Sequence, residues 1–364
     1  MAGTLALGST RSRSLDALGR LFVEFARPVV DRRNPRSRRP FGDAHIMLPH
    51  LESRRWGWSH YGFFVPDLPA PYRYMNTMTL IGTTGTIAFD NDLLAAPDAR
   101  DNATVLASTA SGGHYHYRAY DARTDCDFAA DGSSLRWGAD LEVTTDHPTY
   151  RLRGNYGDFG ADLEFTATEH VSYFVNIPGY QHFSLLAPYR GSIIDGERRI
   201  EVSGVGTVDY ARAMSPQVTS RRPLAPHRRL PVDFFTYQIL PLPNGAQLLL
   251  TDVRIAGASA CRLAHVRWLD RPATVYTDVS FEVLEYGPPL DEPNGDRMAF
   301  PRLMRWTIHD GHDIVATIVG DVDSRPRYGH GNGFVAAMSY TGTWMDDDVA
   351  GTGYLEWIDC EPIR

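Results

Sequence analysis

Two acidic residues of the chain lie in settings where a carboxyl group could do acid-base chemistry. Asp209 follows the run SGVG, whose small residues leave space beside it, and Glu356 lies in GYLEWID, on the opposite strand face from Leu355 and Trp357. Burial raises the pKa of a carboxyl group and keeps it protonated near neutral pH, ready to protonate an unsaturated substrate. The structural alternatives are that Asp209 caps a turn or pairs with Arg212, and that Glu356 holds the two halves of the molecule together.

Two histidines lie in aromatic segments and are candidates to assist such a carboxyl group. In WGWSHYGFFV, strand alternation puts Trp58, His60 and Gly62 on one face, so His60 contacts a ligand if that face points inward. The alternative is a core histidine that is satisfied by backbone partners. His182 and Tyr180, in GYQHFSLL, are further pocket candidates with the same alternative.

The segment GGHYHYRAY places His114, His116 and Arg118 on one face. Two histidines at this spacing suit a metal, but no third ligand follows at a fixed distance, so we predict no metal site. The alternative is that this face points to solvent. Motifs for a serine nucleophile, a phosphate loop, a zinc protease or a dinucleotide fold are absent from the sequence, and GHGNG from Gly329 is interpreted as a turn.

The elements that position these residues are mostly strands. Residues 14–30 have a helical period and form a basic amphipathic helix that packs on the body, closes a barrel or rests on an anionic membrane. From Trp56 onward the period is two, with turn residues every eight to twelve positions. We predict about eight to ten strands in each half, enough for one barrel each, with Arg199 to Ser203 and Thr207 to Arg212 as separate strands. The Pro/Arg-rich residues 215–231 are the predicted linker.

Composition limits the class of protein. The formal charge of -8 argues against nucleic acid as a partner, although the first forty residues are rich in arginine. No apolar run is long enough to span a membrane, and no signal-peptide core follows Met1. Three distant cysteines fit a reducing cytoplasm better than a disulfide framework. The oligomeric state is not indicated.

Four segments in sequence order resemble the AttH-like proteins, a lipocalin-related family that includes carotenoid 1,2-hydratases, kievitone hydratase and fungal Diels-Alderases. They are WGWSHYGFFV, SLLAPYRGSIIDGERRIEVSGVGTVDYAR, FFTYQILPLPNGAQLLLTDVR and GTGYLEWIDC, and they span roughly residues 55 to 360. Asp209 matches the family's aspartate after V-x-G-x-G. Tyr210 stands where the family has histidine, so an acid-base role of that histidine does not carry over.

The resemblance implies an all-β protein of two packed, lipocalin-like antiparallel β-barrels, with no cofactor and a hydrophobic substrate within or between them. We predict a basic helix and arm in residues 1–45, a first barrel in 46–214, a linker in 215–231 and a second barrel in 232–364. The predicted function is cofactor-independent hydration, dehydration, isomerisation or cyclisation of a terpenoid, steroid or polyketide-like molecule. The alternative is a non-catalytic carrier of an apolar molecule. The predicted catalytic residues are Asp209, His60 and His182, and the predicted substrate-binding residues are Trp58, Tyr61, Phe64, Met75, Met78, His114, His116, Tyr180, Tyr210 and Glu356.

Overall fold

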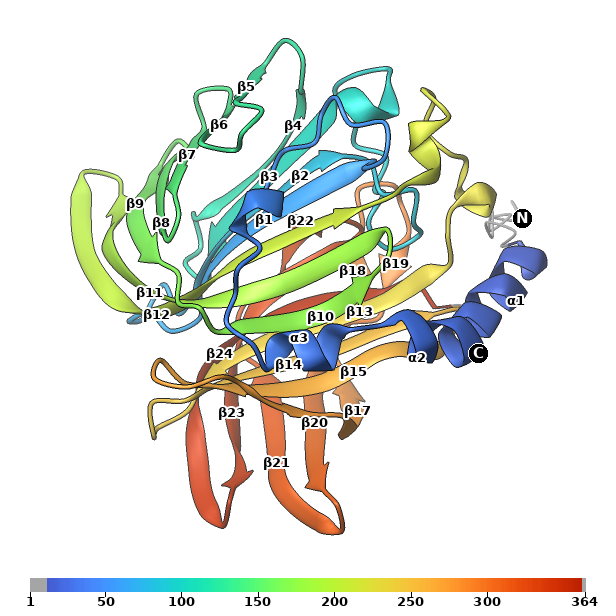
Figure 1. Ribbon diagram of the computed structural model, residues 1–364. Coiled ribbons are helices and arrows are strands. Elements are labelled where there is room, and N and C mark those ends of the chain that lie inside the picture. Colours follow the sequence, from blue (N-terminus) through green and yellow to red (C-terminus); the bar gives the residue numbers. More distant parts are fainter. Residues whose placement is uncertain (1–11, 362–364) are drawn as a thin grey trace, which may run out of the picture.

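The protein consists of two nearly closed antiparallel β-barrel sheets packed against one another, with short helices along one side (Figure 1). This computed structural model describes residues 12–361. Residues 1–11 of the predicted N-terminal arm and residues 362–364 lie outside the described part. The predicted all-β class with two barrel-like sheets is confirmed.

The first sheet has twelve strands in the order β4-β3-β2-β1-β12-β11-β9-β8-β7-β6-β5, with β10 paired to β11. Its strands are β1 (Trp58–Val65), β2 (Met75–Gly82), β3 (Asn102–Thr109), β4 (Tyr115–Asp121), β5 (Cys126–Phe128), β6 (Ser134–Trp137), β7 (Leu141–Asp146), β8 (Thr149–Asn155), β9 (Phe159–Thr166), β10 (Val171–Ile177), β11 (Tyr180–Asp195) and β12 (Arg198–Ala213).

The second sheet has ten strands in the order β16-β15-β14-β13-β24-β23-β21-β20-β17, with β22 paired to β23. Its strands are β13 (Val232–Pro241), β14 (Gln247–Ile255), β15 (Ala258–Arg267), β16 (Thr274–Tyr276), β17 (Asp278–Tyr286), β20 (Pro301–Asp310), β21 (Asp313–Val322), β22 (Arg327–His330), β23 (Gly333–Trp344) and β24 (Asp347–Asp359). A separate two-stranded ribbon pairs β18 (Leu290–Asp291) with β19 (Arg297–Met298).

The long hairpin of β11 and β12 corrects the strand prediction, because residues 199–203 and 207–212 belong to one continuous strand. Gly204 and Gly206 interrupt the apolar pattern of the sequence, yet they pair with Tyr189 and Ala187 across the hairpin. A side chain at Gly204 would meet the Tyr189 ring at 3.1 Å, so the glycine leaves room for that ring. The backbone therefore continues as a strand where the sequence pattern breaks.

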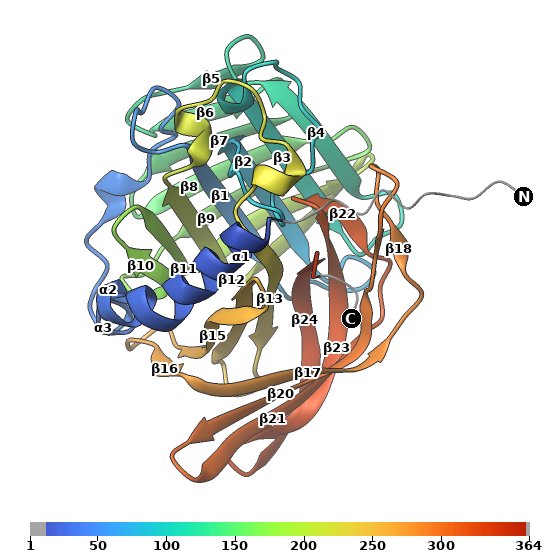
Figure 2. The same ribbon diagram turned by 90° about the vertical axis from the view of Figure 1, so that its right-hand side faces the viewer.

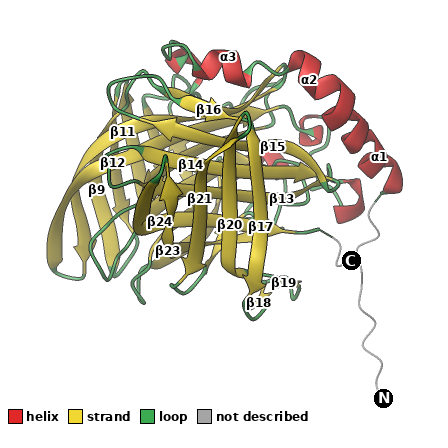
Figure 3. Ribbon diagram, turned by 90° about the horizontal axis from the view of Figure 1, so that it is seen from below, coloured by secondary structure: helices red, strands yellow, loops and turns green. Residues whose placement is uncertain are grey.

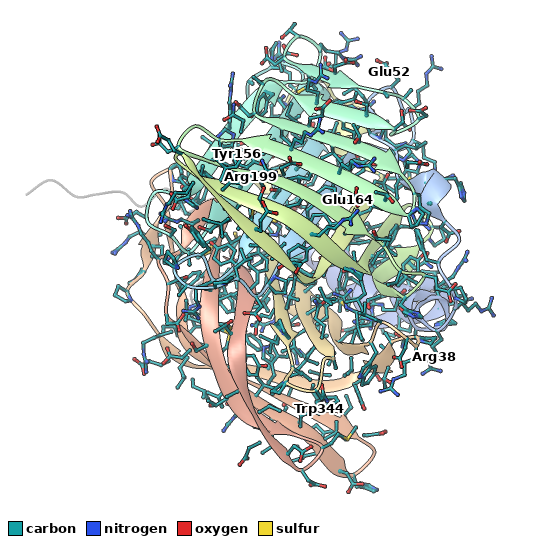
Figure 4. The ribbon with its side chains drawn as sticks, turned by 90° about the vertical axis from the view of Figure 1, so that its left-hand side faces the viewer. Arg38, Glu52, Tyr156, Glu164, Arg199 and Trp344 are labelled. Atoms are coloured by element: carbon teal, nitrogen blue, oxygen red, sulfur yellow. The ribbon has the colours of Figure 1, made fainter. Side chains whose placement is uncertain are left out.

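Burial differs between the two sides of the first sheet. Strands β8 and β9 alternate between buried and exposed residues, and their exposed face carries ion pairs such as Arg151 with Glu164 and Arg199 with Asp162. Arg199 and Glu164 lie on this outer face in Figure 4. Residues 206–211 of β12, in contrast, are buried without interruption. Both faces of that strand are covered, because one faces the interior of the first sheet and the other faces the second sheet.

Two hydrophobic cores result from this arrangement. One fills the interior of the first sheet with aromatic side chains that include Tyr61, Trp137 and Tyr210. The other fills the second sheet and extends to the outer side of the first sheet, where it includes Phe64 and Phe174. The two sheets therefore share one apolar contact region, and the candidate site lies in it.

The helices gather along one side of the strands (Figure 3). The predicted N-terminal helix is confirmed as α1 (Arg13–Leu21), a π-helical turn η1 (Phe22–Ala26) and α2 (Arg27–Val30), followed by α3 (Arg33–Ser37). The Ser12 side chain caps α1 by accepting from the Leu15 N–H, which satisfies one free donor of the first turn. In residues 12–361 no helix is both long and apolar enough to cross a membrane.

Short 3₁₀ turns complete the structure. They are η2 (Ala44–Ile46), η3 (Ala99–Asp101), η4 (Pro216–Val218) and η5 (Pro226–Arg228). The last two lie in the proline-rich stretch between β12 and β13, where the chain passes from the first sheet to the second. Proline has no N–H to donate to a ladder, which explains why this stretch pairs only through the isolated bridge between Thr86 and Leu230.

Candidate functional site

A pocket lies between the two sheets, and we call it the inner pocket. It contains about 1050 Å³ of space not filled by atoms, part of which is open to solvent. The first sheet contributes residues from β1, β2, β11 and β12, and the second contributes residues from β13, β22 and β24. The ionisable side chains in its lining are His60, Asp90, Asp92, Tyr117, Tyr180, His182, Asp209, Tyr237, His330 and Glu356. The cavity is therefore at the contact of the two sheets, whereas the interior of the first sheet is occupied by its own aromatic core.

Asp209 reaches this pocket from β12. At its level the two neighbouring strands carry small residues. Its strand partners are Gly62 on β1 and Ser184 on β11. Asp209 is 2% exposed, and its Oδ2 accepts a hydrogen bond of 2.8 Å from the Tyr237 hydroxyl. Because Tyr237 belongs to β13, this bond connects the carboxyl group of the first sheet to the second sheet.

Burial raises the pKa of Asp209 from 3.8 to about 6. Hydrogen bonding by Ser184, the positive charge of Arg267 and the Tyr237 hydroxyl act in the opposite direction and limit the rise. Arg267 is fully buried and donates a 2.8 Å hydrogen bond to Ser184 Oγ. Asp209 thus has a pKa close to neutrality, where a carboxyl group exchanges protons most readily.

Glu356 approaches the same pocket from the second sheet. It lies on β24 as the strand partner of Tyr237, and its side chain is 3% exposed. Its Oε1 accepts a 3.0 Å hydrogen bond from the Tyr354 hydroxyl. Burial and the nearby charge of Asp209 raise the pKa of Glu356 well above its usual value, and the Tyr354 bond only partly offsets this. Burial therefore favours the protonated form of Glu356.

His60 is held in one tautomer. Its Nδ1 lies 2.7 Å from the Thr79 carbonyl oxygen, which only accepts, so Nδ1 carries the hydrogen and Nε2 carries the lone pair. A Cβ atom at Gly62 would lie 3.0 Å from this Nε2, which places the acceptor over the strand partner of Asp209. Burial lowers the pKa of His60 to about 4, so the ring is neutral.

His182 and His330 complete a group of neutral imidazoles. Burial and the proximity of other histidines lower the pKa of His182 well below its usual value and that of His330 to about 3. The rings of His60 and His182 have centroids 6.1 Å apart. His330 Nε2 lies 3.2 Å from Glu356 Oε2, a close contact without hydrogen-bond alignment. Neutral imidazoles accept and donate hydrogen bonds without adding charge to the pocket.

Aromatic rings surround these groups. Phe64 lies 5.8 Å from Tyr237 and 5.3 Å from Tyr354, between ring centroids. Phe174 packs edge-on against His182 at 4.8 Å and against Tyr237 at 5.4 Å. Ring faces of this kind stabilise positive charge that develops on a bound hydrocarbon.

A second pocket, which we call the outer pocket, continues from the inner one beneath α1. It contains about 1480 Å³ of space not filled by atoms, including space open to solvent, and its lining is mainly apolar. The two pockets share six lining residues: Trp58, Thr84, Phe89, Tyr180, His182 and Phe235. The inner pocket, which holds the ionisable groups, therefore adjoins an apolar pocket whose lining includes Leu15, Leu18 and Phe22 of the N-terminal helix.

The structure brings together one part of the predicted site. The predicted residues that line the inner pocket are Trp58, His60, Phe64, Met78, Tyr180, His182, Asp209 and Glu356. Asp209 does not pair with Arg212, which instead bonds Gln181 and lies over the Trp56 ring. The ion pair with Arg212, one of the two structural alternatives for Asp209, is therefore not formed.

Five of the predicted substrate-binding residues do not line the inner pocket. Met75, Tyr61 and Tyr210 point into the first sheet's own core, where the two tyrosine hydroxyls donate to the carbonyls of Met47 and Leu48. The cause is strand alternation, because neighbours of Asp209 and His60 face the opposite side of the sheet.

The two histidines of β4 and the preceding turn are also remote from the pocket. His114 stacks between Tyr72 and Phe159, and His116 packs against Tyr156. Across residues 12–361, no group of three or more histidine, cysteine, aspartate or glutamate side chains is arranged to hold a metal ion.

Three functional candidates were missed by sequence reasoning: Tyr237, Arg267 and His330. His330 lies in GHGNG, which we interpreted as a turn, but β22 ends there and Gly331 has a φ of 56°. A Cβ at Gly331 would lie 2.6 Å from the Ala88 carbonyl oxygen, so the glycine allows the close approach that turns His330 inward. The sequence signal that could have identified His330 is an ionisable residue between two glycines in a segment between strands.

Comparison with known proteins supports this architecture. A protein from Nitrosomonas europaea, provisionally assigned as AttH, aligns with a TM-score of 0.59 and 15% identity over 89% of this chain and 98% of its own. Kievitone hydratase from Nectria haematococca aligns with a TM-score of 0.57 and 11% identity over 88% of this chain and 93% of its own. Identities this low show a shared fold, and at that level the predicted resemblance is confirmed.

No curated protein matches the chain in sequence. One family does match, over residues 78–364, which begin within β2 and include the whole of the second sheet. The matched segment also contains Asp209, Tyr237, His330 and Glu356. This chain therefore belongs to the family of unknown function DUF6670.

Proposed function

We propose that this protein is a cofactor-independent enzyme that moves protons on a hydrophobic substrate, by hydration or dehydration or by isomerisation of a double bond. The observation that carries the proposal is a pair of buried carboxyl groups, Asp209 and Glu356, that face one pocket from two different sheets and both have raised pKa values. Buried ionisable groups are costly to keep, and they cluster where function requires them.

The two carboxyl groups are suited to opposite roles. With a pKa of about 6, Asp209 is mostly ionised at neutral pH and acts as the base, whereas Glu356 keeps its proton and acts as the acid. In a dehydration, Asp209 removes a proton from carbon while Glu356 donates its proton to the leaving hydroxyl oxygen. The C–O bond breaks, the C=C bond forms and water leaves. Hydration is the reverse, and isomerisation uses the same groups without loss of water.

The neighbouring groups assist these transfers. Tyr237 orients the Asp209 carboxylate through its 2.8 Å hydrogen bond, and Arg267 supplies the counter-charge through Ser184. Glu356 regains a proton after turnover by exchange within the pocket, where His330 is the nearest imidazole. His60 and His182 are positioned to contact the substrate as neutral donors or acceptors.

The substrate class follows from the lining of the pockets. The apolar outer pocket and aromatic inner walls suit a terpenoid, steroid or polyketide-like molecule. The fold shared with kievitone hydratase supports an enzyme over a carrier. The proposed location remains the cytoplasm, on the cysteine spacing alone.

The test is turnover in deuterated water. The protein is incubated with a panel of terpenoid alkenes and tertiary alcohols, and the products are analysed by mass spectrometry for gain or loss of water and for deuterium on carbon. Asp209→Asn should reduce turnover by roughly 10²- to 10⁴-fold while apolar ligands still bind. Glu164→Gln, on the outer face of the first sheet, is the control. A wild-type protein that binds members of the panel and leaves all of them unlabelled and unchanged would be a carrier.

A further inference from the structure

The N-terminal helix has apolar side chains on two of its sides. One side packs on the body of the protein: Val23 is 4% exposed, and a Cβ at Gly19 would lie 2.7 Å from Ile255 Cγ2 and 3.0 Å from Pro231 Cγ. The other side consists of Leu18, Leu21, Phe25 and Val29, which we call the apolar stripe. These four residues follow one another at intervals of three or four, so they form one line along the helix. Only one of the two apolar sides is therefore covered.

The apolar stripe is unusually exposed. Leu18, Leu21, Phe25 and Val29 are 61%, 53%, 67% and 67% exposed. Two further exposed apolar residues, Met214 and Leu230, line the outer pocket beside the helix. Scattered apolar residues are ordinary on a protein surface, but a contiguous group of this kind marks an interaction site.

The charge around the apolar stripe has the opposite sign to that of the whole chain. Residues 12–40 contain eight arginines and three acidic residues, although the chain as a whole carries a formal charge of -8. Arg20 on the helix and Arg32, Arg38 and Arg39 beyond it are exposed. Arg38 extends from the surface near the helical segment in Figure 4. Such a combination of arginines and an exposed apolar line is typical of helices that lie in the interface of an anionic bilayer.

The helix also places the apolar stripe next to the outer pocket. Figure 2 shows α1 crossing in front of the strands where the two sheets meet. Leu18 lies both in the apolar stripe and in the wall of the outer pocket. The exposed line and the pocket entrance are thus adjacent.

We propose that the helix of residues 13–30 docks on an anionic lipid bilayer, with the apolar stripe inserted at the headgroup boundary. An apolar molecule dissolved in the bilayer then enters the outer pocket beside Leu18 without crossing water. Docking follows from the helix alone, and the delivery of substrate rests on the proposed function.

The test is flotation of the full chain with vesicles of phosphatidylcholine, with or without phosphatidylglycerol. Wild type should float with the phosphatidylglycerol vesicles, and this binding should weaken as salt is added. Phe25→Asp with Val29→Asp, two stripe residues outside the pocket walls, should weaken binding at least about tenfold, since each change removes apolar burial. The matched control is Ile314→Asp with Met345→Asp, two residues of the second sheet that are 60% and 50% exposed. Both variants are also checked by thermal melting.

Several results overturn the proposal. They are no flotation of wild type, equal flotation with phosphatidylcholine alone, and equal loss in the control variant. A wild-type dimer in sedimentation that the Phe25/Val29 variant abolishes, without vesicle binding, would assign the apolar stripe to a second copy of the chain. Asp209→Asn should float like wild type, so that a failure of docking and a failure of the catalytic proposal are separate results.

Discussion

Two histidine–carboxylate pairs with the same spacing lie in different parts of this molecule. His114 Nε2 lies 3.2 Å from Asp195 Oδ1 outside the inner pocket, and His330 Nε2 lies 3.2 Å from Glu356 Oε2 within it. Hydrogen bonds from Tyr72 and His114 lower the pKa of Asp195 to about 2, whereas burial raises the pKa of Glu356 well above its usual value. The two carboxyl groups thus shift in opposite directions beside the same kind of partner.

The difference arises from solvent and from the number of donors. The Asp195 side chain is 25% exposed, accepts 2.7 Å from Tyr72 and forms an ion pair with Arg198. Glu356 is 3% exposed, accepts one hydroxyl hydrogen bond and is close enough to Asp209 to feel its negative charge. A histidine beside a carboxylate is therefore not by itself a sign of catalysis. The environment decides whether the pair stabilises the fold or holds a proton.

The largest expected difference between the two histidine–carboxylate pairs is the effect of their carboxyl groups on the turnover rate. Glu356→Gln removes the proposed acid and should lower turnover by roughly 10²- to 10⁴-fold, because the leaving group is no longer protonated. Asp195→Asn makes the matched change in the other pair and should leave turnover within about twofold. Both rates are measured on a substrate found in the deuterium assay. Equal losses in the two variants would contradict the assignment of Glu356 to catalysis.

The same comparison applies to Asp209, because burial of its ionised carboxylate raises the free energy of the folded state. A pKa raised from 3.8 to about 6 corresponds to about 3 kcal/mol of unfolding free energy lost at neutral pH. Asp209→Asn should therefore stabilise the protein by about that amount at pH 7, while it lowers turnover by roughly 10²- to 10⁴-fold.

The stability difference between wild type and Asp209→Asn should depend on pH in one direction. Below pH 3.8 the carboxyl group is protonated in both the folded and unfolded states, so wild type and Asp209→Asn should be equally stable. As pH rises through about 6, wild type loses stability relative to the variant. Denaturant unfolding at several pH values measures this, and a variant less stable than wild type at pH 7 would show that Asp209 is structural.

Substitution of Gly62 tests whether substrate binds and reacts in the inner pocket. A Cβ at Gly62 would lie 2.5 Å from the Phe64 ring, so Gly62→Ala should push that ring into the inner pocket and cost about 1–3 kcal/mol. Ligand binding and turnover should fall together. The control is Gly112→Ala, because nothing lies within 4 Å of a Cβ built there. Fluorescent-ligand titration and thermal melting give the two readouts, and unchanged binding in Gly62→Ala would mean that the substrate binds elsewhere.

The sequence allowed the fold and half of the site to be predicted. Period-two alternation located β1 at Trp58–Val65 and put Trp58 and His60 on one face. Alternation did not indicate which face is functional, because both faces of β1 are buried, one in the first core and one against the second sheet. Tyr61 is buried in the first core and its neighbour His60 is half-buried on the other face, and only the three-dimensional packing shows which of them lines the pocket.

The other half of the site depends on contacts between distant segments. Tyr237 and Glu356 become partners of Asp209 only when β13 and β24 pair and the second sheet packs on the first. His114 and His116 gave a stronger local pattern than His330, yet it is His330 that enters the pocket. Local spacing identifies metal and nucleotide sites well, but a proton-transfer site assembled across two sheets has no fixed spacing.

The smallest expected effect concerns the pair outside the pocket. Because the pKa of Asp195 is depressed in the folded state, ionised Asp195 stabilises the protein above pH 3.8, and this contribution disappears as pH falls through about 2. Asp195→Asn should therefore lower the melting temperature slightly at pH 7, and the difference from wild type should shrink toward pH 2. Glu356→Gln, in contrast, should not lower the melting temperature at pH 7, since burial disfavours the ionised form of Glu356 that the variant removes. Melting curves of both variants across this pH range would measure the contrast, and a pH-independent loss in Asp195→Asn would mean that packing, and not charge, accounts for its contribution.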